Sequence, residues 1–313
     1  MQMSKQNPFN SIKLIALNEY FDEMVKMYES GFFPKVLLLS GNKGIGKFTL
    51  VFHFLNYVYS KKEITHYNTK EKLIDLKSNF YNSILNQTCS DVIFLEGEEG
   101  KNIKIDDIRN LKKVLSKTTL SSKPRFTIID EVEFLNVNSV SALLKTLEEP
   151  TANNFFILIN NQQANLIETI SSRCLVNNIF LNLDKKKAII NYYLQSKKID
   201  FLINDLDILS PGLLLKYSDL SNRYKINDNE NILSKLNKLL YAYKKNKDKS
   251  LINMSIFFVE IFFYKTIGEN RNNINFLLEL KSIIIYKIND FITYNLNINS
   301  VLNSIELKLK NVS

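Results

Sequence analysis

Apolar residues in the first 180 positions gather into short runs that are separated by longer amphipathic stretches. Five runs are of strand length: KVLLLSG (35–41), DVIFLEG (91–97), RFTIIDE (125–131), NFFILINN (154–161) and CLVNNIFL (174–181). Helical spacing occurs between them, in residues 16–31, 47–60, 104–118 and 138–150, whereas residues 61–90 are polar and ambiguous. Runs that are apolar throughout are typical of strands buried on both faces of a parallel sheet. Residues 35–181 therefore predict an open parallel α/β sheet with helices on both faces.

After Leu183 the strand signals end, and helical spacing continues towards the C-terminus. The clearest helical stretches are 184–198, 231–246, 251–268 and 274–296. We predict an α/β core at 1–182, a small helical segment at 183–227 and an all-α domain at 228–313. The last domain contains a phenylalanine stripe, made of Phe257, Phe258, Phe262 and Phe263. The stripe would either bind a partner or fill a helical core, and the helical core is the favoured interpretation.

The residues GNKGIGKFT (41–49) come close to the phosphate-binding pattern G-x-x-x-x-G-K-[ST], which follows a strand and opens a helix. Three glycines would let backbone N–H groups surround an anion: Gly41, Gly44 and Gly46. Lys47 would meet the β- and γ-phosphates, but Phe48 replaces the hydroxyl residue that ligates Mg²⁺. Thr49 comes about 100° further round the helix, so its oxygen is expected to point elsewhere. The sequence predicts weak or absent Mg·ATP binding, unless Phe48 turns aside and water ligates the metal.

Two carboxylates stand at the end of the strand RFTIIDE. In P-loop ATPases one acid at this position holds magnesium through water, and the other activates the attacking water. Asp130 would take the metal role, and Glu131 would be a vestigial or weak base. At the end of the next apolar run, Asn160 or Asn161 would act as a polar sensor, and the sequence leaves both open.

Cationic side chains supply two further candidate functional sites. Arg173 precedes an apolar strand, where it would reach a neighbouring molecule's γ-phosphate as an arginine finger or form an ordinary surface ion pair. Arg109, Lys112, Lys113 and Ser116 share one helix face, which would contact DNA phosphates or simply face solvent.

Composition narrows the class of protein. The formal charge of +9 favours polyanions such as nucleic acid, although a genome-wide bias towards Lys and Asn would produce it as well. Cys89 and Cys174 are too few for a four-cysteine zinc module or a disulfide framework, so no zinc is predicted. The first ten residues lack the apolar region of a signal peptide, and the apolar runs are shorter than the roughly 20 residues of a membrane span. We therefore expect a cytoplasmic protein without a membrane segment.

Five segments, taken in order, resemble the bacterial clamp-loader subunits of the AAA+ superfamily, and among them the delta-prime subunits of DNA polymerase III. They are GNKGIGK, KIDDIRNL, IIDEVEFLNVNSVSALLKTLEEP, NFFILINN and ETISSRC. The resemblance covers residues 30–182, and ALLKTLEEP and SSRC are its most specific parts. The helical remainder is similar in kind to the family's lid and its oligomerising collar domain.

The resemblance implies a role in DNA replication. Clamp loaders are pentameric rings that use ATP to open a sliding clamp and place it on primer-template DNA. A delta-prime subunit is the stator, which needs no cofactor of its own and would offer Arg173 to the ATP site of a gamma or tau subunit, in a ring that also holds delta. Weak ATP or ADP binding stays open, because Lys47, Asp130 and Glu131 are retained. The segment SPGLLLKYS (210–218) lacks the arginine of a second phosphate sensor, which favours the stator.

Two other functions stay open. One is an ATP-hydrolysing motor subunit, as gamma and tau are, which Asp130 and Glu131 support and Phe48 opposes. The other is a stand-alone P-loop protein that binds nucleic acid, for which the basic charge is the argument. ATP turnover by the isolated chain distinguishes the first, and titration with primed DNA distinguishes the second.

Overall fold

The structure is a computed structural model that describes residues 8–97, 103–116, 123–151, 153–197, 209–227, 229–269 and 273–310, apart from the side chains of residues 8, 194–197 and 269. It divides into two compact units, Met1–Leu215 and Lys216–Ser313. The division falls inside one helix, α8 (Pro211–Tyr224). The division into three domains, with boundaries at 182 and 227, stays a prediction. The expectation about a signal peptide falls largely on residues 1–7, outside the described residues.

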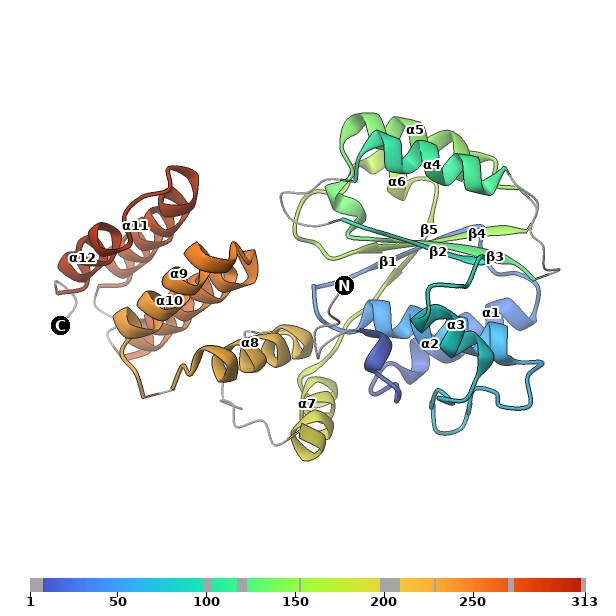
Figure 1. The fold of residues 1–313 in the computed structure, drawn as a ribbon, viewed down its shortest axis with the longest axis horizontal. Helices are drawn as coiled ribbons and strands as arrows, with labels where there is room; N and C mark the ends of the chain where they lie inside the picture. Colours follow the sequence, from blue (N-terminus) through green and yellow to red (C-terminus); the bar gives the residue numbers. More distant parts are fainter. Residues whose placement is uncertain are drawn as a thin grey trace. The chain divides into compact units, whose positions relative to one another are not determined.

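The larger unit is built on a parallel sheet whose five strands, within the described residues, lie in the order β2-β3-β4-β1-β5 (Figure 1). The strands are β1 (Val36–Ser40), β2 (Val92–Glu96), β3 (Arg125–Asp130), β4 (Asn154–Asn160) and β5 (Leu175–Asn178). Every neighbouring pair is parallel. Each strand lies within an apolar run that predicted it, and the predicted α/β sheet is confirmed.

Helices cover both faces of this sheet, as predicted (Figure 1). One face carries α4 (Ile105–Leu115), α5 (Val137–Glu148) and α6 (Glu168–Ser171). The other face carries α1 (Asn18–Glu29), α2 (Lys47–Ser60) and α3 (Asn79–Leu85). Two short 3₁₀ helices, η1 (Pro8–Asn10) and η2 (Val132–Phe134), complete the elements of this part.

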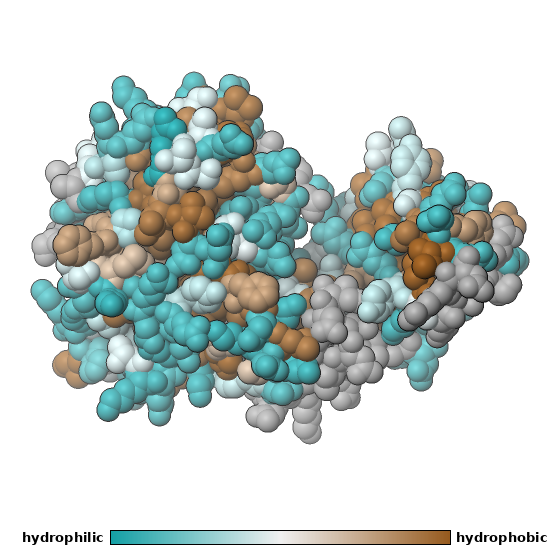
Figure 2. Space-filling view, turned by 180° about the vertical axis from the view of Figure 1, so that it is seen from behind, coloured by the Kyte–Doolittle hydropathy of each residue, from teal (hydrophilic) through white to brown (hydrophobic). Residues whose placement is uncertain are grey.

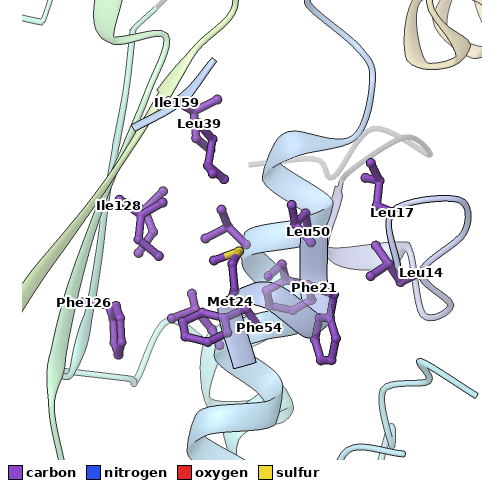
Figure 3. Close-up of a cluster of buried hydrophobic side chains, with 14 of the residues drawn as sticks. Leu14, Leu17, Phe21, Met24, Leu39, Leu50, Phe54, Phe126, Ile128 and Ile159 are labelled. Atoms are coloured by element: carbon purple, nitrogen blue, oxygen red, sulfur yellow. The ribbon is translucent and has the colours of Figure 1, made fainter. Parts of the chain in front are cut away.

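The strands alternate their side chains between two hydrophobic cores, because successive residues of a strand point to opposite faces. Leu37 and Leu39 of β1 join the core formed with α1 and α2, where Figure 3 shows apolar side chains from the helices meeting those from the strands. Val36 and Leu38 join the core formed with α4 and α5. β1 is therefore buried on both sides, which explains its continuous apolar run.

Local signals explain where several helices begin and end. α1 ends at Glu29 and is followed by Gly31 at φ 76°, a backbone conformation that glycine adopts easily. Asn136 caps α5 by accepting a hydrogen bond from the backbone N–H of Ser139 at 2.8 Å. The polar stretch 61–90 contains α3, which was not predicted because a seven-residue helix is too short to show a period.

The rest of the chain is helical, as predicted. Its helices are α7 (Leu183–Lys197), α8, α9 (Ile232–Asn246), α10 (Lys249–Glu269), α11 (Ile274–Thr293) and α12 (Ile298–Leu309). In the smaller unit α10 packs against α9 and α11, and α12 packs against the same two helices. Three members of the phenylalanine stripe are buried and Phe262 is half-buried, so the interpretation as helical core is confirmed. The sequence did not single out α12.

The expectation that all apolar runs are of strand length is wrong for α10. Residues Lys249–Gly268 are long and apolar enough to cross a membrane by length and composition alone. Half of the most apolar window is buried inside the protein, and Leu251, Met254 and Phe263 lie in the core of the smaller unit. Contacts on several sides make a core helix apolar all round, which explains why the helix predicted at residues 251–268 is an apolar run of this length.

A buried histidine ties the N-terminal segment to α2. The ring of His53 is fully buried, with Nδ1 2.9 Å from the Tyr67 hydroxyl and Nε2 2.9 Å from the carbonyl oxygen of Ser11. A carbonyl oxygen only accepts, so Nε2 carries the proton and Nδ1 accepts from Tyr67. Burial lowers the pKa of His53 from 6.5 to about 4, and the ring is neutral in the folded protein.

Acidification from pH 7.5 to pH 5 should therefore reduce the free energy of unfolding. The unfolded chain binds a proton at His53 near pH 6.5, whereas the folded chain resists it down to about pH 4. The loss of unfolding free energy caused by His53 is absent above the pKa of the unfolded chain. Below that pKa the loss grows by at most about 1.4 kcal/mol for each pH unit. Urea denaturation at both pH values measures it.

His53→Gln is the control, because glutamine does not titrate. The variant should lose less stability than the wild type between the two pH values, whatever its absolute stability. Buried carboxyl groups such as Asp130 titrate in both proteins and cancel in the comparison. Equal losses in both proteins would show that His53 is not the group responsible.

Candidate functional site

The phosphate-like loop lies at the carboxyl end of the sheet, between β1 and α2. Parallel α/β sheets bind ligands at this end of their strands. Gly44 and Gly46 have backbone φ values of 81° and 96°, which residues other than glycine rarely adopt. Gly41, whose N–H donates to the carbonyl oxygen of Asn160 at 3.2 Å, fixes the loop to the end of β4. The three predicted glycines thus form one turn that opens α2.

Lys47 is buried and bonded to its own loop. Its Nζ donates to the carbonyl oxygens of Gly41 at 2.6 Å and Asn42 at 2.8 Å. Burial lowers the pKa of Lys47 to about 8, although the charges of Asp130 and Glu133 oppose the shift. The ammonium group therefore has backbone acceptors in place of a phosphate.

Phe48 turns its ring into an aromatic cluster. The ring centroid lies 5.4 Å from that of Phe9 and 5.7 Å from that of Phe94 on β2. Such packing anchors the first turn of α2 and offers no oxygen for a metal. Thr49 follows on α2 and is half-buried, and the direction of its hydroxyl stays a prediction.

The predicted acid pair lies at the end of β3, at the same edge of the sheet. Oδ1 of Asp130 accepts from the backbone N–H of Glu131 at 2.8 Å and from Nδ2 of Asn161 at 3.1 Å. Burial raises the pKa of Asp130 to about 6, against the effect of these hydrogen bonds and of Lys47. Glu131 is buried in a left-handed conformation at φ 56°, and its Oε1 lies 2.5 Å from Nζ of Lys43. The proposed base is therefore engaged in an ion pair with the loop.

The two asparagines after β4 have different contacts. Nδ2 of Asn160 donates to the Ser40 hydroxyl at 3.1 Å, which joins the ends of β4 and β1. Asn161 reaches Asp130, as described above, so it is the asparagine bonded to the acid pair. Which of them acts as a sensor stays a prediction.

Glu133 is a site residue that sequence reasoning missed. This buried carboxylate accepts from the backbone N–H of Asn161 at 3.0 Å and from that of Gln163 at 3.4 Å. It thereby fixes the turn after β4 against η2. The signal was present as a third acid in DEVE (130–133), but only the fold shows that it points inward.

A second missed feature is the contact between the loop and the start of α8. The N–H of Gly212 donates to the carbonyl oxygen of Gly44 at 2.8 Å. A Cβ on Gly212 would lie 2.7 Å from that oxygen, and one on Gly44 would lie 2.4 Å from Oγ of Ser210. Both distances are too short for a side chain, so the two backbones touch. The SPG segment, which the sequence predicted only as a break, packs directly on the loop.

Three of the residues that would meet a magnesium nucleotide have other contacts in this structure. Lys47 is bonded inward, Glu131 is paired with Lys43, and Phe48 offers no ligand to the metal. The start of α8 covers Gly44, part of the surface that would face the phosphates. Expectations of zinc or nucleotide binding are not tested by these contacts and stay predictions.

Arg173 lies at the opposite edge of the sheet from the loop. It precedes β5, which is parallel to β1 with Leu175 beside Leu37. Arg173 is therefore level with the residue before β1, whereas the loop follows Ser40. At about 3.3 Å per residue, the two ends of β1 are roughly 16 Å apart. The arginine does not face the loop of its own chain.

The predicted DNA-contacting residues lie on the outer side of α4. Ile108, Leu111 and Leu115 of this helix are buried, while Ile105 is half-buried. Arg109 is exposed and pairs with Asp106 at 3.0 Å, Lys113 is exposed and Lys112 is half-buried. Contact with DNA stays a prediction.

The strand order, the loop after β1 and the acid pair after β3 define an AAA+ type of P-loop fold. Comparison with known proteins gives the family. Residues 17–181 match the family described as "DNA polymerase III, delta subunit", which is more than half of the chain. The chain belongs to this family of DNA polymerase III clamp-loader subunits.

Individual relatives agree with this assignment. The chain is 38% identical over 88 residues to the delta-prime subunit of DNA polymerase III from Pseudomonas aeruginosa, which is 28% of this chain and 27% of that protein. It is 31% identical over 186 residues to the gamma subunit from Buchnera aphidicola subsp. Schizaphis graminum, 58% of this chain and 48% of that protein. These matches span a quarter to a half of the relatives' length.

A solved structure shows the same fold along nearly the whole chain. It is a DNA polymerase III gamma subunit-related protein from Thermotoga maritima, with a TM-score of 0.51 and 17% identity. The match covers 94% of this chain and 99% of that one. At this identity the likeness establishes the fold alone.

Calorimetric titration of the purified chain with Mg·ATP should give no binding, or a dissociation constant weaker than about 1 mM. Lys47 would have to leave its backbone acceptors, and no hydroxyl at position 48 would receive the metal. Phe48→Thr should not restore tight binding, because the contacts of Lys47, Glu131 and Gly44 remain.

Lys47→Ala is the control for this titration. Binding by the wild-type chain that this substitution abolishes would show that the loop still works. ATP hydrolysis as a motor subunit would then be better supported as the function of this chain than a stator role.

Proposed function

We propose that this chain is a delta-prime-like stator of the bacterial clamp loader, and that it supplies Arg173 to the ATP site of a neighbouring subunit. The observation that carries the proposal is the position of Arg173 at the amino edge of the sheet, away from the loop of its own chain. An arginine in that position reaches a phosphate only on another molecule. Arginine suits this task because its guanidinium group is always charged and donates several hydrogen bonds in fixed directions.

The state of the loop supports a stator rather than a motor. A motor subunit needs a free lysine, a metal ligand and a base at its loop. Here the lysine bonds its own backbone, Phe48 packs into an aromatic cluster, and Glu131 is paired with Lys43. The AAA+ core would then serve as a rigid body that holds Arg173 in place.

The exposed apolar side chains after Arg173 also support contact with a neighbour. Leu175, Val176 and Phe180 are 52%, 44% and 72% exposed along and after β5. Hydrophilic and apolar side chains are interspersed on the face of the protein that Figure 2 shows. A neighbouring subunit that met Arg173 would cover some of these apolar side chains.

The proposed partners follow from the family. They are gamma or tau subunits, which would hold the ATP, and a delta subunit, in a pentameric ring. The ring would act in the cytoplasm on a sliding clamp and on primer-template DNA. The basic side chains of α4 would contact that DNA within the ring.

The second candidate is a motor subunit that hydrolyses ATP. Its support is the similarity to gamma subunits over half of this chain and the retention of Lys47, Asp130 and Glu131. Steady ATP turnover by the isolated chain, lost in Lys47→Ala, would establish this function instead.

Arg173→Ala should lower the DNA-stimulated ATPase rate of the reconstituted clamp loader. An arginine supplied in trans is worth roughly 10³-fold or more in rate at the site that it serves. The total ATPase rate of the loader should therefore fall by the fraction that this one site contributes. Arg173→Lys should restore little, because an ammonium group lacks the planar fork.

Arg223→Ala is the matched control, because Arg223 is also an exposed arginine in an ion pair, with Asp219 at 3.0 Å. It should leave the ATPase rate unchanged. An unchanged rate in Arg173→Ala, with the ring fully assembled, would remove the arginine from the proposed function.

A further inference from the structure

The guanidinium group of Arg173 is held from two sides by its own chain. Oε1 of Glu148 lies 2.6 Å from Nε and 2.6 Å from Nη2. Nη1 donates to the carbonyl oxygen of Thr169 at 2.9 Å and lies 3.3 Å from the Ser172 hydroxyl. These partners come from the end of α5 and from α6, so two elements together fix one side chain.

The arrangement leaves the tip of the guanidinium group available. Arginine has five N–H bonds, and Nη2 carries two of them. Glu148 approaches on the side of Nε, so it can take only one of the two on Nη2. The other N–H of Nη2 points away from the carboxylate, where an oxygen of another molecule can accept it. Glu148 therefore need not leave when Arg173 binds a phosphate.

The position of Glu148 is not explained by the stability of α5. Glu148 is the last residue of the helix, and Glu149 is its C-cap. Negative charge is unfavourable at a helix C-terminus, because the carbonyl groups there carry partial negative charge. The ion pair itself adds little stability, since both side chains are partly exposed, 34% for Arg173 and 46% for Glu148.

The contacts with Glu148 and Thr169 hold the guanidinium group of Arg173 in one orientation. A free arginine side chain has many rotamers, and much of that entropy is lost when it binds a phosphate in one geometry. Contacts that hold it beforehand reduce that loss. We propose that Glu148 is a positioning residue, which orients the guanidinium group of Arg173 towards the nucleotide of a neighbouring subunit. The inference rests on the proposed function of Arg173 in trans.

Glu148→Ala should lower kcat of the reconstituted loader's ATPase about three- to fivefold at the site served by Arg173, which corresponds to an ion pair of about 1 kcal/mol. KM for ATP should stay unchanged, because the neighbouring subunit's own loop binds the nucleotide. Glu148→Gln should stay within about twofold of the wild type, since its amide oxygen still accepts from Nε.

Glu149→Ala is the matched control. Glu149 is the adjacent residue, carries the same charge and is exposed, but its side chain is not the partner of Arg173. This variant should behave as the wild type. The double variant Glu148→Ala/Arg173→Ala should be no slower than Arg173→Ala, because Glu148 acts through the arginine.

The outcomes separate this inference from the function on which it rests. If Arg173→Ala slows the loader and Glu148→Ala does not, Glu148 is not a positioning residue and the arginine finger remains. If Glu148→Ala is faster than the wild type, the carboxylate restrains the arginine, which also overturns the inference. An unchanged rate in Arg173→Ala would overturn the proposed function itself.

An NMR measurement tests the contact without an assembled loader. The ¹⁵N–¹H signal of Nε in Arg173 should be resolved and slow to exchange in the isolated wild-type chain, because a carboxylate oxygen accepts this proton. Glu148→Ala should make its exchange with water several-fold faster, and Glu149→Ala should not. Equal exchange in all three proteins would mean that Glu148 does not hold the arginine in solution.

Discussion

The parallel direction of every strand in the sheet is the constraint on which the rest of this structure depends. Residues that follow strands meet at one edge, and residues that precede strands meet at the other. The loop after β1, the acids after β3 and the asparagines after β4 therefore share the carboxyl edge. Arg173 comes before β5 and lies at the amino edge. One topology gives the chain a loop that faces one way and an arginine that faces the other.

The carboxyl edge has the parts of a nucleotide site in an arrangement that keeps them bonded to one another. Burial without a ligand would leave Lys47, Asp130 and Glu131 poorly solvated, which costs free energy unless partners are supplied. Backbone carbonyls, Asn161 and Lys43 are those partners. The raised pKa of Asp130 and the lowered pKa of Lys47 are consequences of this burial. These contacts form a polar network that connects the loop with the ends of β3 and β4.

The amino edge is built differently, from exposed groups that are held in place. Arg173 is oriented by Glu148 from α5 and by the backbone of α6, and it remains partly exposed. The hydrophobic core on one face of the sheet includes Val140, Leu143 and Leu147 of α5 and Ile170 of α6, and it packs both helices against the sheet. A clamp-loader stator would need this rigidity, because its contribution is to present one side chain in a constant position.

The sequence by itself determined the strands, most of the helices and the functional candidates. Short continuous apolar runs are typical of strands buried on both faces, as β1 and β4 are, and the glycine pattern admits few conformations. Other features were decided by the tertiary structure. Glu133, the Gly44–Gly212 contact and the Glu148–Arg173 pair join residues 25 to 168 positions apart, and no local pattern marks such partners. The seven-residue α3 was not predicted, since a periodic pattern needs length to be visible. The long apolar helix α10 was predicted as a helix, and its burial among other helices was decided by the tertiary structure.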